Sequence, residues 1–308
     1  MGENQDLEKA YLRLTDYPKK EDVRPLKVLI KALAHIKNRY IQDEDFEWAN
    51  EQLKSVRQDM TVQNIQNRFV IDVYETHARI LLEHGDLDEF NQCQTMIRSL
   101  TEANVGDATL TKSDSILSDS MACGFEGKIP LRELLVQCPE SADEFRGYAI
   151  LYALVRNSSM DLKTELSRTR KIKGDNESKS RIKHDRESCC DHAMMVVRAI
   201  DENDYRTFFR LYESAPHMSA YLMDFLVKRV RDGAYERIVA AYRPNVSLEH
   251  FRECLRFDDL EETRKFLYQH GAVFVEETDC ASPSRTKRPK TESTAFWVDC
   301  RASSAALT

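Results

Sequence analysis

Glycine and proline are scarce in this chain, which has nine glycines and eight prolines among 308 residues. This composition excludes collagen-like and proline-rich proteins and leaves few positions that would interrupt a helix. Long apolar runs are also missing, because none approaches the ~20 residues that a membrane-spanning helix needs. The charged start, MGENQDLEKAYLRLT, differs from a signal peptide. We therefore expect a helical protein with no membrane segment.

Motifs of catalysis and cofactor binding are missing as well. Neither a phosphate-binding glycine loop nor the H-E-x-x-H or G-x-S-x-G motif of hydrolases occurs. His77 follows an apolar helical spacing, so we interpret it as a core histidine hydrogen-bonded to a neighbour rather than a catalytic base. We predict no catalytic residue, no cofactor and no enzyme activity.

The eight cysteines contain no C-x-x-C pair. Cys189, Cys190 and His192 are residue types that bind zinc, and His184 is close in sequence. Adjacent cysteines cannot easily both face one tetrahedral ion. We therefore predict no metal site there, and reduced thiols throughout.

Charge is distributed unevenly along the chain. The net charge is −7, yet residues 167–186 carry eight basic and three acidic side chains, and residues 281–291 carry four basic side chains and no acid. Blocks of like charge are usually exposed loops or tails. For residues 167–186 both a solvated connector and a binding element remain open. An acidic body with local basic segments favours a protein partner over general nucleic-acid binding.

The most regular pattern is a pair of helices within residues 46–100. Apolar residues recur at three- and four-residue spacing over 69–81 and again over 87–100, so each set lies on one helical face. His84-Gly85-Asp86 separates them. Gly85 can take the left-handed conformation that ends a helix, and Asp86 can cap the next one. This predicts an αα-hairpin, the unit of a helical repeat array.

The end of the chain changes pattern. Helical spacing over 226–242, 247–256 and 259–270 is followed by alternation over 273–276 and 295–299. Three short helices and two strands joined by a loop have the order of a winged helix, in which residues 279–293 would be the wing. The apolar strand residues Val273, Val275, Phe296 and Val298 are the candidate partner interface.

The sequence thus predicts a mainly α protein in several parts. These are an extended lead-in at 1–25, a TPR-like array of helical hairpins at 26–223, a winged helix at 224–301 and a tail at 302–308. Within the array, 104–140 and 167–188 lack sustained apolar periodicity and are expected to be insertions or loops.

Several stretches carry a specific resemblance. They are LEKAYLRLT (7–15), VRPLKVLIKAL (23–33), LKSVRQDMTVQNI (53–65), VYETHARILLEHGDLDEFNQCQ (73–94), YAILY (148–152) and FFRLYESAPHMSAYLMD (208–224). The chain resembles the GANP-type (SAC/GANP/THP) family of PCI-domain proteins and looks closest to the branch typified by leukocyte receptor cluster member eight. The likeness is close over 7–100 and looser over 145–277. The segments near 104–140 and 170–188 and the long wing depart from the family pattern.

The resemblance implies a non-catalytic scaffold of the nucleus that serves mRNA export, transcription elongation or splicing. It also implies pairing with a second PCI-domain protein and a small acidic peptide of the DSS/Sem type, and a winged helix that can contact RNA or DNA. Two alternatives stay open. One is a PCI subunit of the proteasome lid, signalosome or a translation initiation complex, which copurifying proteins would identify. The other is a nucleic-acid-binding regulator that acts alone, for which tight partner-free binding would be diagnostic.

Basic residues give candidate contacts for nucleic acid and for import. The candidates for phosphate contact are Lys228, Arg229, Arg231 and Arg237 on the first helix of the predicted winged helix, with Arg264 and Lys265 on its third. Acidic neighbours on the third helix, such as Glu261 and Glu262, would repel a duplex backbone, so sequence-specific reading is not expected. Lys287, Arg288 and Lys290 match the compact basic pattern of nuclear import signals, although an ordinary basic wing has the same composition.

Overall fold

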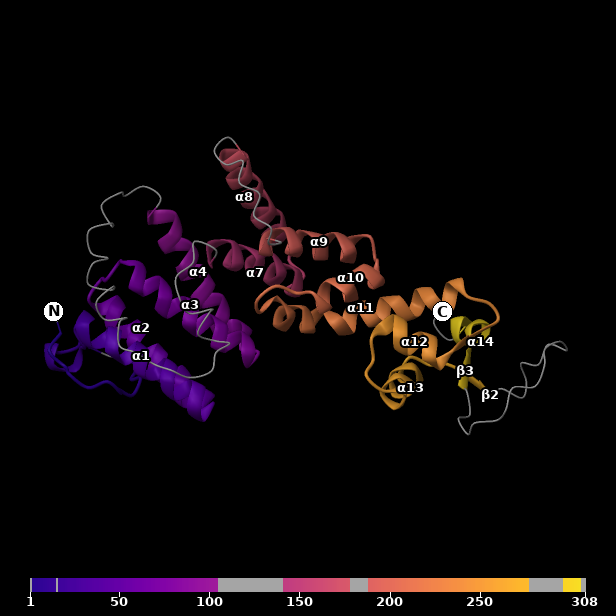
Figure 1. Cartoon of the computed structure of the whole chain (residues 1–308), viewed down its shortest axis with the longest axis horizontal. Coiled ribbons are helices and arrows are strands. Elements are labelled where there is room, and N and C mark those ends of the chain that lie inside the picture. The colour runs from indigo at the N-terminus through magenta and orange to yellow at the C-terminus, as the bar shows by residue number, and fades with distance from the viewer. Residues whose placement is uncertain (1, 15, 105–140, 178–187, 277–295, 306–308) are drawn as a thin grey trace. The chain divides into compact units, whose positions relative to one another are not determined.

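The computed structural model describes residues 2–14, 16–104, 141–177, 188–276 and 296–305 (Figure 1). The chain divides into two compact units, Met1–Phe145 and Arg146–Thr308. Both are built mainly from helices, as the sequence predicts. Several predicted features lie outside the described residues. They are residues 105–140 of the loop expected at 104–140, the wing at 279–293, and the import residues Lys287, Arg288 and Lys290.

The N-terminal unit is a row of antiparallel helices behind an extended lead-in. A single 3-10 turn, η1 (Lys20–Asp22), precedes the helices. These are α1 (Leu26–Asp43), α2 (Phe46–Val62), α3 (Arg68–Glu83) and α4 (Leu87–Asn104), and each packs on the next in chain order. The helix α3 is buried along nearly its whole length, because neighbours cover it on two sides.

The predicted hairpin is confirmed in α3 and α4. Gly85 has a φ of 73°, the left-handed conformation that ends α3 without a Cβ clash. Asp86 accepts a hydrogen bond from the Glu89 amide at 3.1 Å and so caps α4. Residues 84–86 are therefore the turn on which the hairpin depends.

The described part of the chain continues with five more helices, the first of which begins just before the division between the units. They are α7 (Ser141–Val155), α8 (Ser159–Glu177), α9 (Cys189–Asp201), α10 (Tyr205–Glu213) and α11 (Ser219–Ala241). The prediction of a loop from residue 167 is wrong for its first part, because α8 runs to Glu177. Lysine, arginine, glutamate and leucine favour helix without an apolar stripe, and Arg168 also pairs with Glu165 at 2.9 Å.

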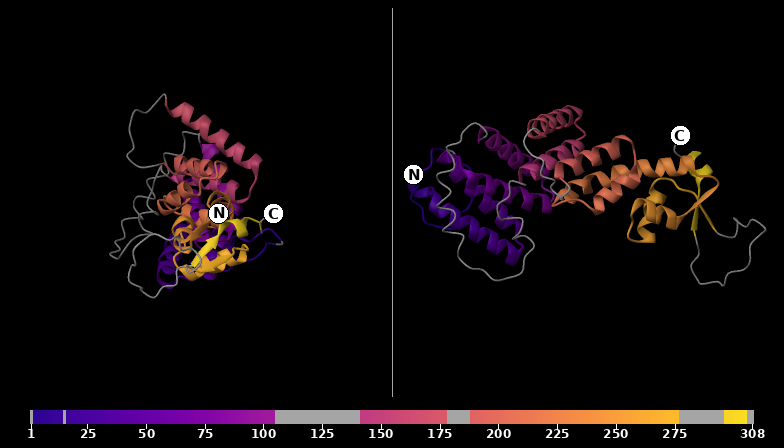
Figure 2. Two further views of the ribbon diagram at one scale, coloured as in Figure 1. Left: turned by 90° about the vertical axis from the view of Figure 1, so that its right-hand side faces the viewer. Right: turned by 45° about the horizontal axis from the view of Figure 1, so that its top comes forward.

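A small sheet closes the chain. The strands β1 (Asn245–Ser247), β2 (Phe274–Glu276) and β3 (Phe296–Asp299) form an antiparallel sheet of order β1-β3-β2, visible at the C-terminal end in Figures 1 and 2. The two predicted strands pair in the register Phe274↔Val298 and Glu276↔Phe296. The strand β1 escaped prediction because three residues are too few to show alternation.

Helices α11, α12 (Leu248–Leu255) and α13 (Leu260–Gln269) enclose a core with this sheet. Tyr235, Phe251 and Val298 are fully buried in it. Ser247 caps α12 by accepting from the His250 amide, and Asp259 caps α13 by accepting from the Glu261 amide. The expected tail is in part a helix, α14 (Cys300–Ala305), which packs on α11. The expected domain boundary at residue 224 falls inside α11.

Candidate functional site

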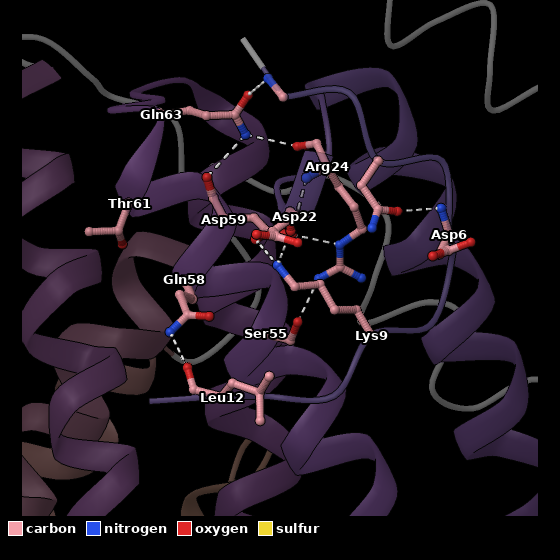
Figure 3. A network of polar contacts seen from close by, with 12 residues as sticks. Asp6, Lys9, Leu12, Asp22, Arg24, Ser55, Gln58, Asp59, Thr61 and Gln63 are labelled. Carbon is pink, nitrogen blue, oxygen red and sulfur yellow. Dashed lines mark hydrogen bonds and ion pairs between the residues drawn. The ribbon is translucent and has the colours of Figure 1, made fainter. Parts of the chain in front are cut away.

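The lead-in is tied to α2 by a buried ion pair (Figure 3). Arg24 is fully buried and its Nε donates to Asp59 Oδ2 at 2.6 Å. The same guanidinium donates to Ser55 Oγ at 2.9 Å and to the Leu7 carbonyl at 3.2 Å. Lys9 Nζ approaches Asp59 Oδ1 at 2.6 Å, so two cations share one buried carboxylate. This arrangement fixes residues 7–24 against the helical row.

Glutamines on and after α2 hold the extended backbone of the lead-in. Gln52 Oε1 accepts from the Lys9 amide at 2.8 Å, and Gln58 Nε2 donates to the Leu12 carbonyl at 2.8 Å. Gln63 accepts from the Gly2 amide at 3.1 Å and donates to the Arg24 carbonyl at 2.8 Å (Figure 3). This surface of the unit therefore binds an extended peptide through side-chain amides.

A second polar cluster centres on Arg57, also on α2. Its Nη1 donates to Glu89 Oε1 at 2.6 Å and to His77 Nδ1 at 3.1 Å. The guanidinium carbon lies 5.1 Å from the centre of the Tyr74 ring. His77 Nε2 contacts Asn50 Oδ1 at 2.9 Å. Because Arg57 can only donate, His77 Nδ1 is the acceptor and Nε2 carries the proton.

Burial sets the protonation states in this cluster. It holds the pKa of His77 well below its ordinary value, with further lowering from Arg57 and Lys54. Burial also raises the pKa of the Cys93 thiol to about 12. For Arg57 burial lowers the pKa, but Cys93, Glu89 and Tyr74 more than offset it and the pKa is raised. A neutral histidine, a thiol and a fixed cation position one another here, in agreement with the interpretation of His77 as a core residue.

The low pKa of His77 predicts a pH-dependent stability. The unfolded chain takes up a proton near pH ~6.5, whereas folded His77 does not, so stability falls as pH decreases below ~6.5. We expect His77→Gln to remove up to about 1.4 kcal/mol per pH unit from the slope between pH 6 and 5. Urea unfolding at several pH values measures it. His84→Gln, at an exposed histidine of the same unit, is the control. Equal slopes for wild type and His77→Gln would contradict the assignment.

In the C-terminal module, residues 219–305, the structure divides the predicted interface residues between two faces of the sheet. Val298 is fully buried in the core, and Phe274 packs on the same core. Val298 is therefore wrong as an interface residue, because the alternation of β3 turns it inward. Val273 is 42% exposed and Val275 is half-buried. Trp297, which pairs with Val275, shares their face and was missed. Phe296 is placed in β3 by the backbone alone.

The basic residues predicted to contact phosphate also fall into two groups, and Arg231 and Arg237 form the first. Arg231 Nε donates to the Leu255 carbonyl at 3.0 Å, and its guanidinium carbon lies 3.8 Å from the centre of the Phe257 ring. Burial lowers the pKa of Arg231, a further sign that it serves packing. Arg237 donates to the Asn203 carbonyl at 2.9 Å. Both arginines hold turns of this unit together.

Five of the candidates are exposed to solvent, namely Arg237 and the four that follow. Lys228 and Arg229 are neighbours on α11, and Arg229 Nη1 lies 3.4 Å from Asn157 Oδ1. Arg264 and Lys265 are on α13, where Arg264 lies 3.9 Å from Glu261. Because Arg264 lies close to an acidic residue of α13, Lys228 and Arg229 are better placed than Arg264 and Lys265 to bind an anion.

The candidate metal residues are part of the core. Cys189, Cys190 and His192 are all buried at the start of α9, and His192 Nε2 contacts the Leu211 carbonyl at 2.9 Å. Among the described residues no group of three His, Cys, Asp or Glu side chains could hold a metal ion. None of the described helices combines the length and the apolar character needed to cross a bilayer.

Comparison with known proteins identifies the family of this chain. The SAC3/GANP family model matches residues 7–276. The chain belongs to the SAC3/GANP family. It is 35% identical over 276 residues, 89% of its length, to the leukocyte receptor cluster member 8 homolog of Xenopus laevis. It is 33% identical over 285 residues, 92% of its length, to a THP3 homolog of Schizosaccharomyces pombe, and 29% identical over 275 residues, 88% of its length, to Protein THP3 of Saccharomyces cerevisiae.

These relatives are longer proteins. The SAC3/GANP region of this chain covers 29% of the Xenopus relative, 60% of the Schizosaccharomyces relative and 50% of the Saccharomyces relative. Family membership confirms the resemblance that the sequence carries. The family match includes the helical row and most of the C-terminal module, so both parts have to be considered in proposing a function.

Proposed function

We propose that this SAC3/GANP protein is a non-catalytic scaffold subunit of a nuclear complex in mRNA biogenesis, acting in export, transcription elongation or splicing. Membership of the SAC3/GANP family and the similarity to THP3 proteins support this general role. The observation that carries the proposal is the C-terminal module, in which helices α11, α12 and α13 share one core with the sheet β1-β3-β2. Proteins that only join others need such a rigid surface and no reactive group.

The same module supports a finer description of the fold. The order helix α11, strand β1, helices α12 and α13, strands β2 and β3 is that of a winged helix. The successive antiparallel helices before it have the character of a TPR-like array. Together they would form a PCI domain, with the winged helix joined to the array through the continuous helix α11 (Ser219–Ala241). One unbroken helix is a stiff connection for docking partners.

We propose that a second PCI-domain protein pairs with the outer face and edge of the sheet. Among the described strands β2 lies at an edge of the sheet, and Val273, just before it, and Val275, within it, expose apolar surface there. An unpaired edge is a template for an added strand. A small acidic peptide of the DSS/Sem type is the third proposed component, on the strength of the family resemblance alone. A PCI subunit of the lid, signalosome or an initiation complex would use the same face, and the copurifying subunits distinguish them.

Nucleic acid would bind weakly, through Lys228 and Arg229 with help from Arg264 and Lys265. Each phosphate that a basic side chain neutralises contributes about 0.7 to 0.9 to the magnitude of the slope of log affinity against log salt concentration. We expect Lys228→Glu/Arg229→Glu to reduce the slope of log affinity against log salt by about 1 to 2, measured by fluorescence anisotropy with single-stranded RNA. Arg237→Ala is the control, since Arg237 bonds backbone. An unchanged slope in the double variant would contradict this assignment. Tight binding without partners, with a steep salt dependence that the double variant flattens, would instead favour a regulator that acts alone.

Nuclear residence would use Lys287, Arg288 and Lys290. Replacing the three with alanine in a tagged protein should move it toward the cytoplasm. An unchanged nuclear signal would remove them from this role.

A further inference from the structure

A groove of about 520 Å³ opens beside the docked lead-in in the N-terminal unit. The lead-in contributes Tyr11 and Leu14, and the helices contribute the rest of the lining, which includes Lys54, Arg57 and Gln92. A volume of this size suits a ligand or a few side chains of a peptide. All its lining residues fall within 7–15, 53–65 and 73–94, three of the stretches that carry the family resemblance.

We propose that this groove binds an extended acidic peptide segment of a partner protein. The inference concerns the N-terminal unit and does not depend on the role proposed for the C-terminal module. Its occupant would place a carboxylate at Lys54, an apolar side chain against Tyr11 and Leu14, and its backbone along the glutamines.

The charges of the groove favour one carboxylate. Lys54 and Arg57 share a single acid, Glu89, which leaves one positive charge in excess. Arg57 is held tightly at 2.6 Å from Glu89, whereas Lys54 Nζ is 3.6 Å away and the lysine side chain is 28% exposed. Lys54 can therefore turn to an incoming carboxylate while Arg57 keeps Glu89 neutralised. One excess charge suits a carboxylate better than the row of phosphates that a nucleic acid would bring.

The apolar rim favours a peptide that carries a large side chain. Tyr11 and Leu14 are 42% and 43% exposed, although the backbone between them is fixed to α2 through the Leu12 carbonyl. Because their backbone is already fixed, covering these side chains with a partner costs side-chain ordering but little backbone ordering. They lie beside the polar residues of the groove, so an occupant would meet both an apolar and a charged surface.

Glutamine side chains already bind the backbone of the lead-in, and we expect a glutamine of the groove to bind the backbone of the occupant in the same way. Gln52 and Gln58 show that α2 presents amides suited to an extended chain. Gln92, on α4, also lines the groove. Its side chain is exposed and makes no hydrogen bond to the rest of the described chain. Its amide can both donate to and accept from a peptide group.

The test uses the whole protein and labelled nonapeptide pools in fluorescence anisotropy. One pool places aspartate or glutamate and one Phe, Leu or Tyr at varied positions on a serine–alanine background. A matched pool carries lysine in place of the acids, and a labelled uridine dodecamer represents nucleic acid. We expect the acidic pool to bind best and Lys54→Glu to weaken it about tenfold or more. Lys27→Glu, the same change at an exposed site on α1, should leave binding unchanged.

A second variant guards against loss of folding. Gln92→Trp fills the groove from an exposed position, so it should block binding and leave thermal unfolding unaltered. Equal binding of the acidic and lysine pools, or binding that both groove variants leave intact, would overturn the proposal. So would displacement of the acidic pool by the uridine oligonucleotide at a site sensitive to Lys54→Glu, because that result would assign the groove to RNA.

Discussion

Arg24→Ala should destabilise the N-terminal unit by about 3–5 kcal/mol, because it leaves a buried carboxylate without its main partner. Arg24 is fully buried and Asp59 is 1% exposed, so water cannot replace the lost hydrogen bonds. Of the cations that pair with Asp59 in the described part of the chain, Lys9 would remain, and its side chain is 20% exposed. We also expect the lead-in to become accessible to proteases, since Arg24 holds the Leu7 carbonyl as well.

Urea unfolding followed by the fluorescence of Trp48 measures this loss. The chain has two tryptophans, so a Trp297→Phe background leaves Trp48, in α2, as the reporter of the N-terminal unit. Arg13→Ala is the matched control, because Arg13 is exposed on the same lead-in. If Arg24→Ala were no more destabilising than Arg13→Ala, the network of Figure 3 would not hold the lead-in.

Arg79→Ala should have an effect of similar size, about 3–5 kcal/mol. Arg79 on α3 forms a bidentate pair with Glu144 in the first turn of α7, with Nε–Oε1 and Nη2–Oε2 distances of 3.0 and 2.6 Å. The two side chains are only 4% and 3% exposed. Burial already raises the pKa of nearby Glu75, and Arg79 opposes that shift. Removing Arg79 should therefore raise the pKa of Glu75 further.

The same reporter and a paired variant test this pair. Replacing both partners, as Arg79→Met/Glu144→Leu, should recover much of the loss, because neither charge is then left buried alone. Asp43→Ala, which breaks an exposed pair with Arg39 in the same unit, should cause little change. A double variant as unstable as Arg79→Ala would show that the site needs the shape of the arginine rather than its charge.

Local patterns predicted the elements of this fold well. Gly85 and Asp86 form the turn of the α3–α4 hairpin, as predicted, because both roles depend on neighbours in sequence. The helix α8 was missed beyond residue 167, since a helix stabilised by propensity and charge pairs shows no apolar stripe.

Long-range contacts explain what the sequence did not predict. Arg24 and Asp59 are 35 positions apart, and Arg79 and Glu144 are 65 apart. Neither pairing leaves a periodic signal, and charged residues are usually read as surface. Val298 was assigned to the wrong face because two short strands do not show which side α11 and α12 cover; the buried Tyr235 and Phe251 of those helices decide it.

Purification of the tagged protein from its own cells, with mass spectrometry of what binds, tests the scaffold role most directly. We predict a stoichiometric second PCI-domain subunit with the wild type and with Met160→Glu, a change at an exposed site on α8. Val273→Glu/Val275→Glu should lose it. Recovery of the chain alone, or of the same subunit with the sheet-face variant, would contradict the proposal that this module joins partner proteins.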